Sequence, residues 1–135
     1  MLIVVDTNVL VSGLLSPDNP PGRIVDLIVA SVLQLAVDDR IMAEYEDVLT
    51  REPFSFPPRQ AMALLDHVRL NGRLVSAVPI YSKKIPDPSD LPFAEVALAA
   101  GVDVIVTGNK THFAFVAELG LSALSPRAFL RQLLE

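Results

Sequence analysis

The chain has 135 residues, of which 51% are hydrophobic and 20% charged, and its formal net charge is −5. This length and composition predict one globular domain over residues 1–135, with a core of its own. The absence of cysteine excludes a disulfide framework and a thiolate metal site, and the negative charge argues against a protein that coats nucleic acid through a basic surface.

The N-terminal segment does not have the pattern of a secretion signal. It has no basic region, and its apolar run meets Asp6 after five residues. The sequence also contains no stretch of 18 apolar residues that would cross a bilayer. We therefore expect a cytoplasmic protein that does not contact a membrane.

Apolar segments of strand and helix type alternate between three clusters of prolines. In chain order we predict a strand over 2–5, helices over 9–15 and 22–31, a strand over 33–37, helices over 39–50 and 59–70, a strand over 74–78, a helix over 90–100, a strand over 103–107, a helix over 112–119, a strand over 121–124 and a helix over 126–134. This alternation indicates an α/β fold with a parallel sheet covered by helices on both faces.

Two predicted strands end in polar triplets of similar chemistry. The first runs into Asp6-Thr7-Asn8 and the strand over 103–107 into Thr107-Gly108-Asn109. Asp, Thr and Asn are all good helix N-caps, so the first triplet can simply begin a helix. In open α/β sheets, however, ligands bind at the carboxyl ends of the strands. If the two strands are neighbours, Asp6 and Asn109 face the same crevice.

Further acids stand on the predicted helices. Asp87 and Asp90 lie where a helix begins, and the helix dipole alone favours acids there. Glu44 and Glu46 both flank the apolar face of the helix over 39–50, so helical spacing does not separate them. Several carboxylates at one edge would repel each other unless they surround a hard cation such as Mg²⁺. Such a site can activate water for hydrolysis of a phosphodiester.

Three segments in order, IVVDTNVLVSGLL, IMAEYEDVL and DPSDLPFAEVALAAGVDVIVTGNKTHF, resemble the PIN (PilT N-terminus) domain family of nucleases. They are most similar to the VapC-like branch, the toxin components of toxin–antitoxin pairs, and the resemblance spans about residues 2–130. It implies a three-layer α/β/α sandwich with a parallel sheet of four or five strands. It also implies an endoribonuclease that uses Mg²⁺ or Mn²⁺ to hydrolyse single-stranded RNA, a small antitoxin partner and a homodimer.

The resemblance also assigns roles to individual residues. The family's metal-binding acids match Asp6, Glu44 and Asp90, with Asp87 in reserve for the third position, and the fourth position, usually Asp, is Asn109. Asn offers a neutral oxygen, so three carboxylates remain, which is enough for a single Mg²⁺. The residues expected to orient the ligands are Thr7, Asn8 and Thr107.

Two other functions stay open on the sequence. A degenerate PIN fold would bind RNA or protein without cutting, and Asn109 favours that alternative. A phosphatase would use Asp6 as its nucleophile, but haloacid-dehalogenase-like enzymes have a second Asp where this chain has Asn8. His112 and Lys110 could approach the crevice, although we expect solvated side chains at both positions.

Overall fold

The computed structural model describes residues 1–51, 56–80, 87–102 and 104–135. Its strands form one parallel sheet in the order β3-β2-β1-β4-β5. The strands are β1 (Leu2–Val5), β2 (Gln34–Val37), β3 (Arg73–Leu74), β4 (Val104–Val106) and β5 (Ser122–Leu124). The helices are α1 (Thr7–Leu15), α2 (Pro20–Val29), α3 (Asp39–Leu49), α4 (Pro58–Asn71), α5 (Leu91–Ala100) and α6 (Pro126–Leu133), with 3₁₀ turns over Pro88–Asp90 and Ala114–Leu119.

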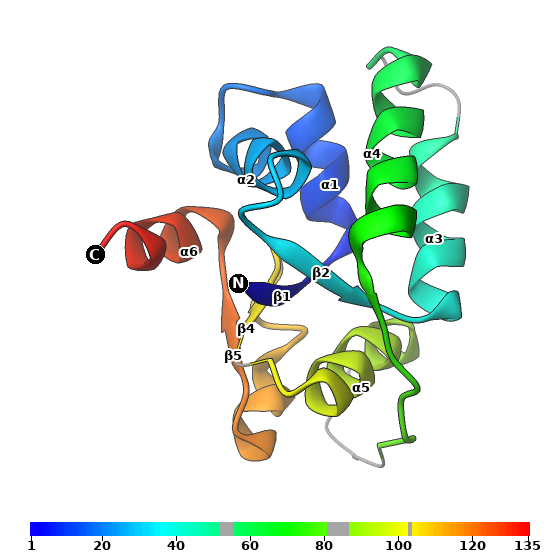
Figure 1. Ribbon diagram of the computed structural model, residues 1–135. Coiled ribbons are helices and arrows are strands. Elements are labelled where there is room, and N and C mark those ends of the chain that lie inside the picture. Colours follow the sequence, from blue (N-terminus) through cyan, green and yellow to red (C-terminus); the bar gives the residue numbers. More distant parts are fainter. Residues whose placement is uncertain (52–55, 81–86, 103) are drawn as a thin grey trace.

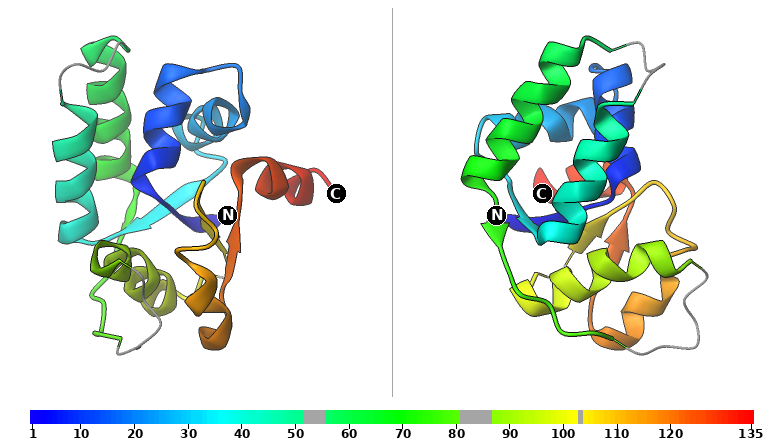
Figure 2. Two further views of the ribbon diagram at one scale, coloured as in Figure 1. Left: turned by 180° about the vertical axis from the view of Figure 1, so that it is seen from behind. Right: turned by 90° about the vertical axis from the view of Figure 1, so that its right-hand side faces the viewer.

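The helices cover both faces of this sheet. Helices α1 to α4 lie on one side, α5 and the turn 114–119 on the other, and α6 packs beside α2 (Figures 1 and 2). The predicted three-layer α/β/α sandwich with a parallel sheet is therefore confirmed. Among the described residues, no helix is both long and apolar enough to cross a membrane.

Strand β1 occupies the centre of the sheet because its sequence suits a strand buried on both faces. Ile3, Val4 and Val5 are all fully buried. These β-branched side chains pack well on a pleated surface, and a continuous apolar run is typical of a strand between two helical layers. The central position brings the residue that follows β1 into the middle of the carboxyl edge.

The predicted strand over 74–78 is shorter and begins earlier than expected. β3 covers only Arg73–Leu74, and the Val75 N–H still donates to the Val37 carbonyl at 2.9 Å. β2 ends at Val37 and the chain then turns into α3, so no strand remains beside residues 76–78. In the predicted strand over 103–107, Asp103 lies outside the described residues.

Several helix ends also differ from expectation, and the helix predicted over 112–119 is a 3₁₀ turn over Ala114–Leu119. α2 begins at Pro20 rather than Gly22, because both prolines fit the first turn, where backbone N–H groups have no helical partner. α4 ends at Asn71, one residue beyond the predicted range 59–70, and Gly72 after it is extended. Glycine is required there for space, since a Cβ on Gly72 would lie 2.5 Å from the Val68 carbonyl oxygen.

Helices α1 and α2 approach each other closely at Gly13. A Cβ on Gly13 would lie 2.6 Å from Val25 Cγ2 and 2.7 Å from the Pro21 carbonyl oxygen. The backbone oxygen cannot turn away as a flexible side chain could. The crossing therefore keeps α2 against α1, the helix that begins directly after Asp6.

We predict that Gly13→Ala destabilises the protein by about 1 kcal/mol or more, measured by denaturant unfolding. Alanine gains about 1 kcal/mol in helix propensity, but overpacking costs about 1–3 kcal/mol and strains a backbone contact. Ser12→Ala, at an exposed position on the same helix, is the control. A more stable Gly13→Ala variant would show that the two helices separate freely.

Candidate functional site

The neighbouring positions of β1 and β4 bring the two polar triplets together. The Asp6 N–H donates to the Val106 carbonyl at 2.9 Å, and Thr107 Oγ1 donates to Asp6 Oδ2 at 2.9 Å. The Asn109 N–H donates to Thr107 Oγ1 at 3.0 Å. Asp6 occupies the N-cap position of α1, yet within the described chain its side chain makes no capping hydrogen bond. Its carboxylate is held by Thr107 instead.

Helix α3 contributes Glu44, and the ambiguity with Glu46 is resolved by their surroundings. Thr7 Oγ1 donates a hydrogen bond to Glu44 Oε2, whereas Glu46 forms an ion pair with Arg69 on α4. The hydroxyl of Tyr45, between the two acids, donates to the Val5 carbonyl at 2.5 Å. This bond fixes α3 to the last residue of β1, and Glu44 is thereby placed beside the start of α1.

Asp90 and Asp87 serve different purposes at the start of α5. Asp87 Oδ1 accepts the Ser89 N–H at 3.0 Å, so its carboxylate caps the 3₁₀ turn. Asp90 is buried, and its Oδ2 has no hydrogen-bond partner among the residues that the structure describes. His112 Nδ1 lies 3.6 Å from that oxygen, so His112 lines the crevice although its side chain is 43% exposed.

The acids open into one cleft of about 230 Å³. Its lining residues are Asp6, Thr7, Asn8, Glu44, Val48, Asp87, Ser89, Asp90, Phe93, Asn109, His112 and Phe113. Apart from Thr107, which is fully buried, every site residue predicted from the sequence lines this cleft. The rings of Phe93 and Phe113 meet edge to face with centroids 6.5 Å apart, and Phe93 also contacts Tyr45. These rings form an apolar floor.

The carboxylates in the cleft are poorly compensated. Burial raises the pKa of Asp6, and the negative charge of Glu44 adds to this, while the hydrogen bond from Thr107 opposes it. Burial also raises the pKa of Asp90 to about 6, with further contributions from the charges of Asp6 and Asp87. Among the described residues, His112 opposes the shift of Asp90 by its charge, but burial and the charges of Asp6 and Asp87 outweigh it.

The residues fit a hard cation in donor chemistry. The cleft offers carboxylate, hydroxyl and amide oxygens, and the buried Asp90 Oδ2 has an unused acceptor position. In the described part of the chain, however, no group of three or more His, Asp or Glu side chains stands close enough to hold an ion directly. The arrangement thus suits Mg²⁺, which keeps several waters and commonly takes one or two carboxylates from the protein.

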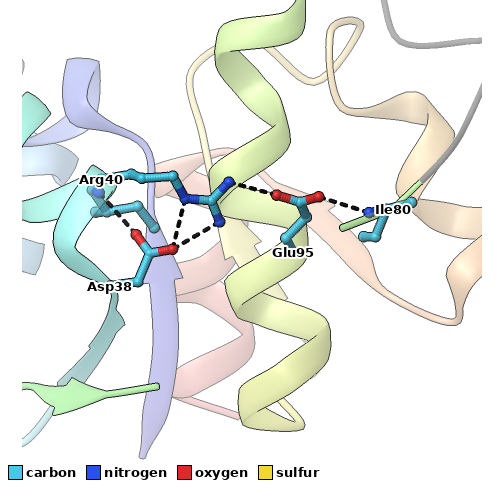
Figure 3. A network of polar contacts seen from close by, with 5 residues as sticks. Asp38, Arg40, Ile80 and Glu95 are labelled. Atoms are coloured by element: carbon cyan, nitrogen blue, oxygen red, sulfur yellow. Dashed lines mark hydrogen bonds and ion pairs between the residues drawn. The ribbon is translucent and has the colours of Figure 1, made fainter. Parts of the chain in front are cut away.

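A polar network next to the cleft ties together the helices that carry Glu44 and Asp90 (Figure 3). Arg40 on α3 binds Glu95 on α5 at 2.7 Å and Asp38 at 2.7 Å. Glu95 is buried, and its Oε2 also accepts the Ile80 N–H at 2.6 Å. The sequence analysis missed this network. The available signal was Glu95 itself, the one charged residue in the segment LPFAEVALAA.

Comparison with known proteins gives the family. A family model described as the PIN domain matches residues 2–111. The chain belongs to the PIN domain family. Proteins of this family are typically nucleases, which are hydrolases, and they generally use a divalent metal ion. The search of curated protein sequences gave no match.

The fold is similar to that of a solved structure. A chain in the crystal structure of VapBC2 from Rickettsia felis, bound to a DNA fragment from their promoter, superposes on this PIN domain with a TM-score of 0.59. The identity is 17%, and the match covers 93% of this chain and 98% of the other. At 17% sequence identity, the similarity of the two structures confirms the fold of this chain.

The raised pKa of Asp90 predicts a pH-dependent stability in the presence of EDTA. The folded pKa of about 6 lies above the ordinary value of 3.8. The stability that the protonated carboxyl contributes is therefore complete below pH 3.8 and is lost as the pH rises through 6. Asp90→Asn should therefore melt higher than the parent at pH 7.5 and equally at pH 4. Asp87→Asn should show no such gain, because the hydrogen bond from Ser89 lowers the pKa of Asp87. If the melting temperatures of Asp90→Asn and the parent differ by the same amount at every pH, this prediction is wrong.

The Arg40 network predicts unequal effects of two arginine substitutions. Arg40→Met leaves the buried Glu95 carboxylate without its charged partner, which should cost roughly 2 kcal/mol of unfolding free energy. Arg51→Met is the matched control, because Arg51 pairs with Asp47 on the exposed face of the same helix. That change should cost about 0.5 kcal/mol or less. Equal losses in urea unfolding would rule out a special role for Arg40.

Proposed function

We propose that this PIN-domain protein is a metal-dependent endoribonuclease that hydrolyses phosphodiesters of single-stranded RNA. The observation that carries the proposal is the convergence of Asp6, Glu44 and Asp90 on one cleft, where a buried oxygen of Asp90 has an unused acceptor position. The charge of Glu44 raises the pKa of Asp6, and the charge of Asp6 raises the pKa of Asp90, as in a site whose missing partner is a cation. The family supports hydrolysis of nucleic acid as the reaction class.

In this proposal Asp6, Glu44 and Asp90 hold Mg²⁺ or Mn²⁺ directly or through water, and the side-chain oxygen of Asn109 assists. The bound ion supplies positive charge that activates water and stabilises the charge developing on the phosphate. Asp90 is preferred to Asp87, because the Asp87 carboxylate already accepts the Ser89 N–H. The overall reaction adds water to phosphorus and breaks one P–O bond.

The neighbouring polar residues position the acids. Thr107 binds one oxygen of Asp6, and Thr7 binds one oxygen of Glu44, so each carboxylate keeps its other oxygen for a ligand. Partners that fix the orientation of ligating side chains are a regular part of metal sites. Asn8 lines the cleft and is exposed, which places it to contact the substrate rather than the ion.

We further propose that the protein is the toxin of a toxin–antitoxin pair, neutralised by a small antitoxin in the cytoplasm. The fold likeness to a chain of VapBC2 from Rickettsia felis supports this role. A homodimer fits the exposed apolar side chains Leu70, Leu74 and Val78 around the end of α4 and the strand at the sheet edge. Sedimentation at micromolar concentration tests the dimer, and a clean monomer would contradict it.

One observation favours a second function, a PIN domain that binds RNA or protein without cutting. Asn109 lines the cleft where the family usually has a carboxylate, so one negative charge is missing from the site. Catalysis requires the ion and binding does not, so the two functions differ in their dependence on metal.

We predict that the purified protein cleaves mixed single-stranded RNA with Mg²⁺ or Mn²⁺ and that EDTA abolishes cleavage. The same ions should raise the melting temperature, because a ligand that binds only the folded state stabilises it by mass action. Asp6→Asn should remove most of both effects, whereas Asp26→Asn, at an exposed position on α2, should change neither. RNA binding without metal-dependent cleavage would favour the non-catalytic function.

We also predict that Asn109→Asp tightens Mg²⁺ binding, since hard cations prefer anionic oxygen. Asn8→Asp is the control, because it adds the same charge to the same cleft beside Asp6. Calorimetric titration should give the larger gain for Asn109→Asp. An equal or smaller gain would place Asn109 outside the coordination shell.

A further inference from the structure

A second cavity adjoins the acidic cleft and is assigned no role by the proposed reaction. This groove, of about 420 Å³, lies between the starts of α1, α2 and α6, and its lining includes Asn8, Ser12, Pro20, Pro21, Gly108 and Arg127. Asn8 lines both the groove and the cleft. Gly108 of the groove directly precedes Asn109 of the cleft, so the two cavities are neighbours along this edge of the sheet.

The groove and the cleft have opposite chemistry. The cleft is lined by the carboxylates of Asp6, Glu44, Asp87 and Asp90, whereas the described residues of the groove include no acid. Its walls are Val9 and the proline rings, with the hydroxyls of Ser12 and Ser125 among them. Arg127 is exposed and forms no ion pair with any residue that the structure describes.

We propose that this groove binds the nucleotide of single-stranded RNA that follows or precedes the scissile phosphate. The inference rests on the proposed nuclease function and adds a substrate subsite to it. The base would lie against the apolar walls, Asn8 and Ser12 would meet its polar edge, and Arg127 would meet the next phosphate. Recognition of single strands combines a surface for each base with cationic contacts to the backbone.

Because the net charge is −5, the protein needs local positive charge to bind the phosphates of RNA. Phosphates are repelled by the acids of the cleft, so the ion must attract the scissile group and a separate cation must attract its neighbour. Arg127 is well placed for that purpose, because it is the one charged side chain among the described residues of the groove. An RNA strand that occupies both cavities would pass Asn8, which lines the cleft and the groove.

Gly108 provides a way to fill the groove without disturbing the fold. A Cβ on Gly108 would meet no atom within 4 Å, and its backbone is not among the glycines with positive φ. Gly108→Leu should therefore fold normally while its side chain projects into the open space. Ser122→Leu, at an exposed position on β5 outside both cavities, is the matched control.

The test measures binding of a fluorescent single-stranded RNA decanucleotide by anisotropy, with Ca²⁺ in place of Mg²⁺. Gly108→Leu should weaken binding about tenfold, as expected when one base loses its contact surface. Arg127→Ala should weaken it and lower the slope of log affinity against log salt by about 0.7, the value for one phosphate contact on a single strand. Ser122→Leu and Arg131→Ala, which removes an exposed arginine of the same helix, should leave both quantities unchanged.

The outcomes separate this inference from the proposed function. If the parent protein cleaves RNA but Gly108→Leu and Arg127→Ala bind RNA as tightly as the parent does, the subsite is wrong. The proposed nuclease function is then unaffected, whether or not a protein partner uses the groove. If Arg127→Ala and Arg131→Ala weaken RNA binding equally, the subsite is also wrong, because the electrostatic attraction would then not be localised at the groove. If the parent neither binds nor cleaves RNA, both proposals fail together.

Discussion

The parallel pairing of β1 with β4 is the constraint on which the candidate site depends. The register sets Val4 opposite Ile105 and Val5 opposite Val106, so the residues after both strands meet at the same edge. Asp6 continues the ladder through its N–H and then receives the Thr107 hydroxyl on its carboxylate. A slip of one residue would turn every side chain of β1 to the other face.

Around this pairing, tertiary contacts position α3, which carries Glu44, and α5, which begins directly after Asp90. Tyr45 anchors α3 to β1 through the Val5 carbonyl, and Arg40 ties α3 to α5 through Glu95. These contacts hold carboxylates together although their charges and their burial oppose it. An arrangement that raises the pKa of its own acids costs folding stability, and such a cost is typical of a functional site. Asn109, which is neutral, reduces the repulsion by one charge.

Much of this was visible in the sequence, because the alternation of elements and the polar triplets depend on local patterns. Helical spacing did not choose between Glu44 and Glu46, since both flank the apolar face of one helix. The family resemblance matched Glu44, and contacts with Thr7 and Arg69 give the two acids different surroundings. The end of β3 depended on where its partner β2 stops. The link between Arg40 and Glu95 joins residues 55 positions apart, and local spacing carries no information about such a pair.

The central claim is that Asp6, Glu44 and Asp90 form one metal site, and its most direct test is a crystal structure of the protein soaked with Mn²⁺, analysed by anomalous difference density. The account predicts one strong peak in the cleft, in contact with the carboxylates of Asp6 and Asp90 or with waters bound to them. An empty cleft, or a peak only at surface acids such as Asp47 or Asp66, would contradict it.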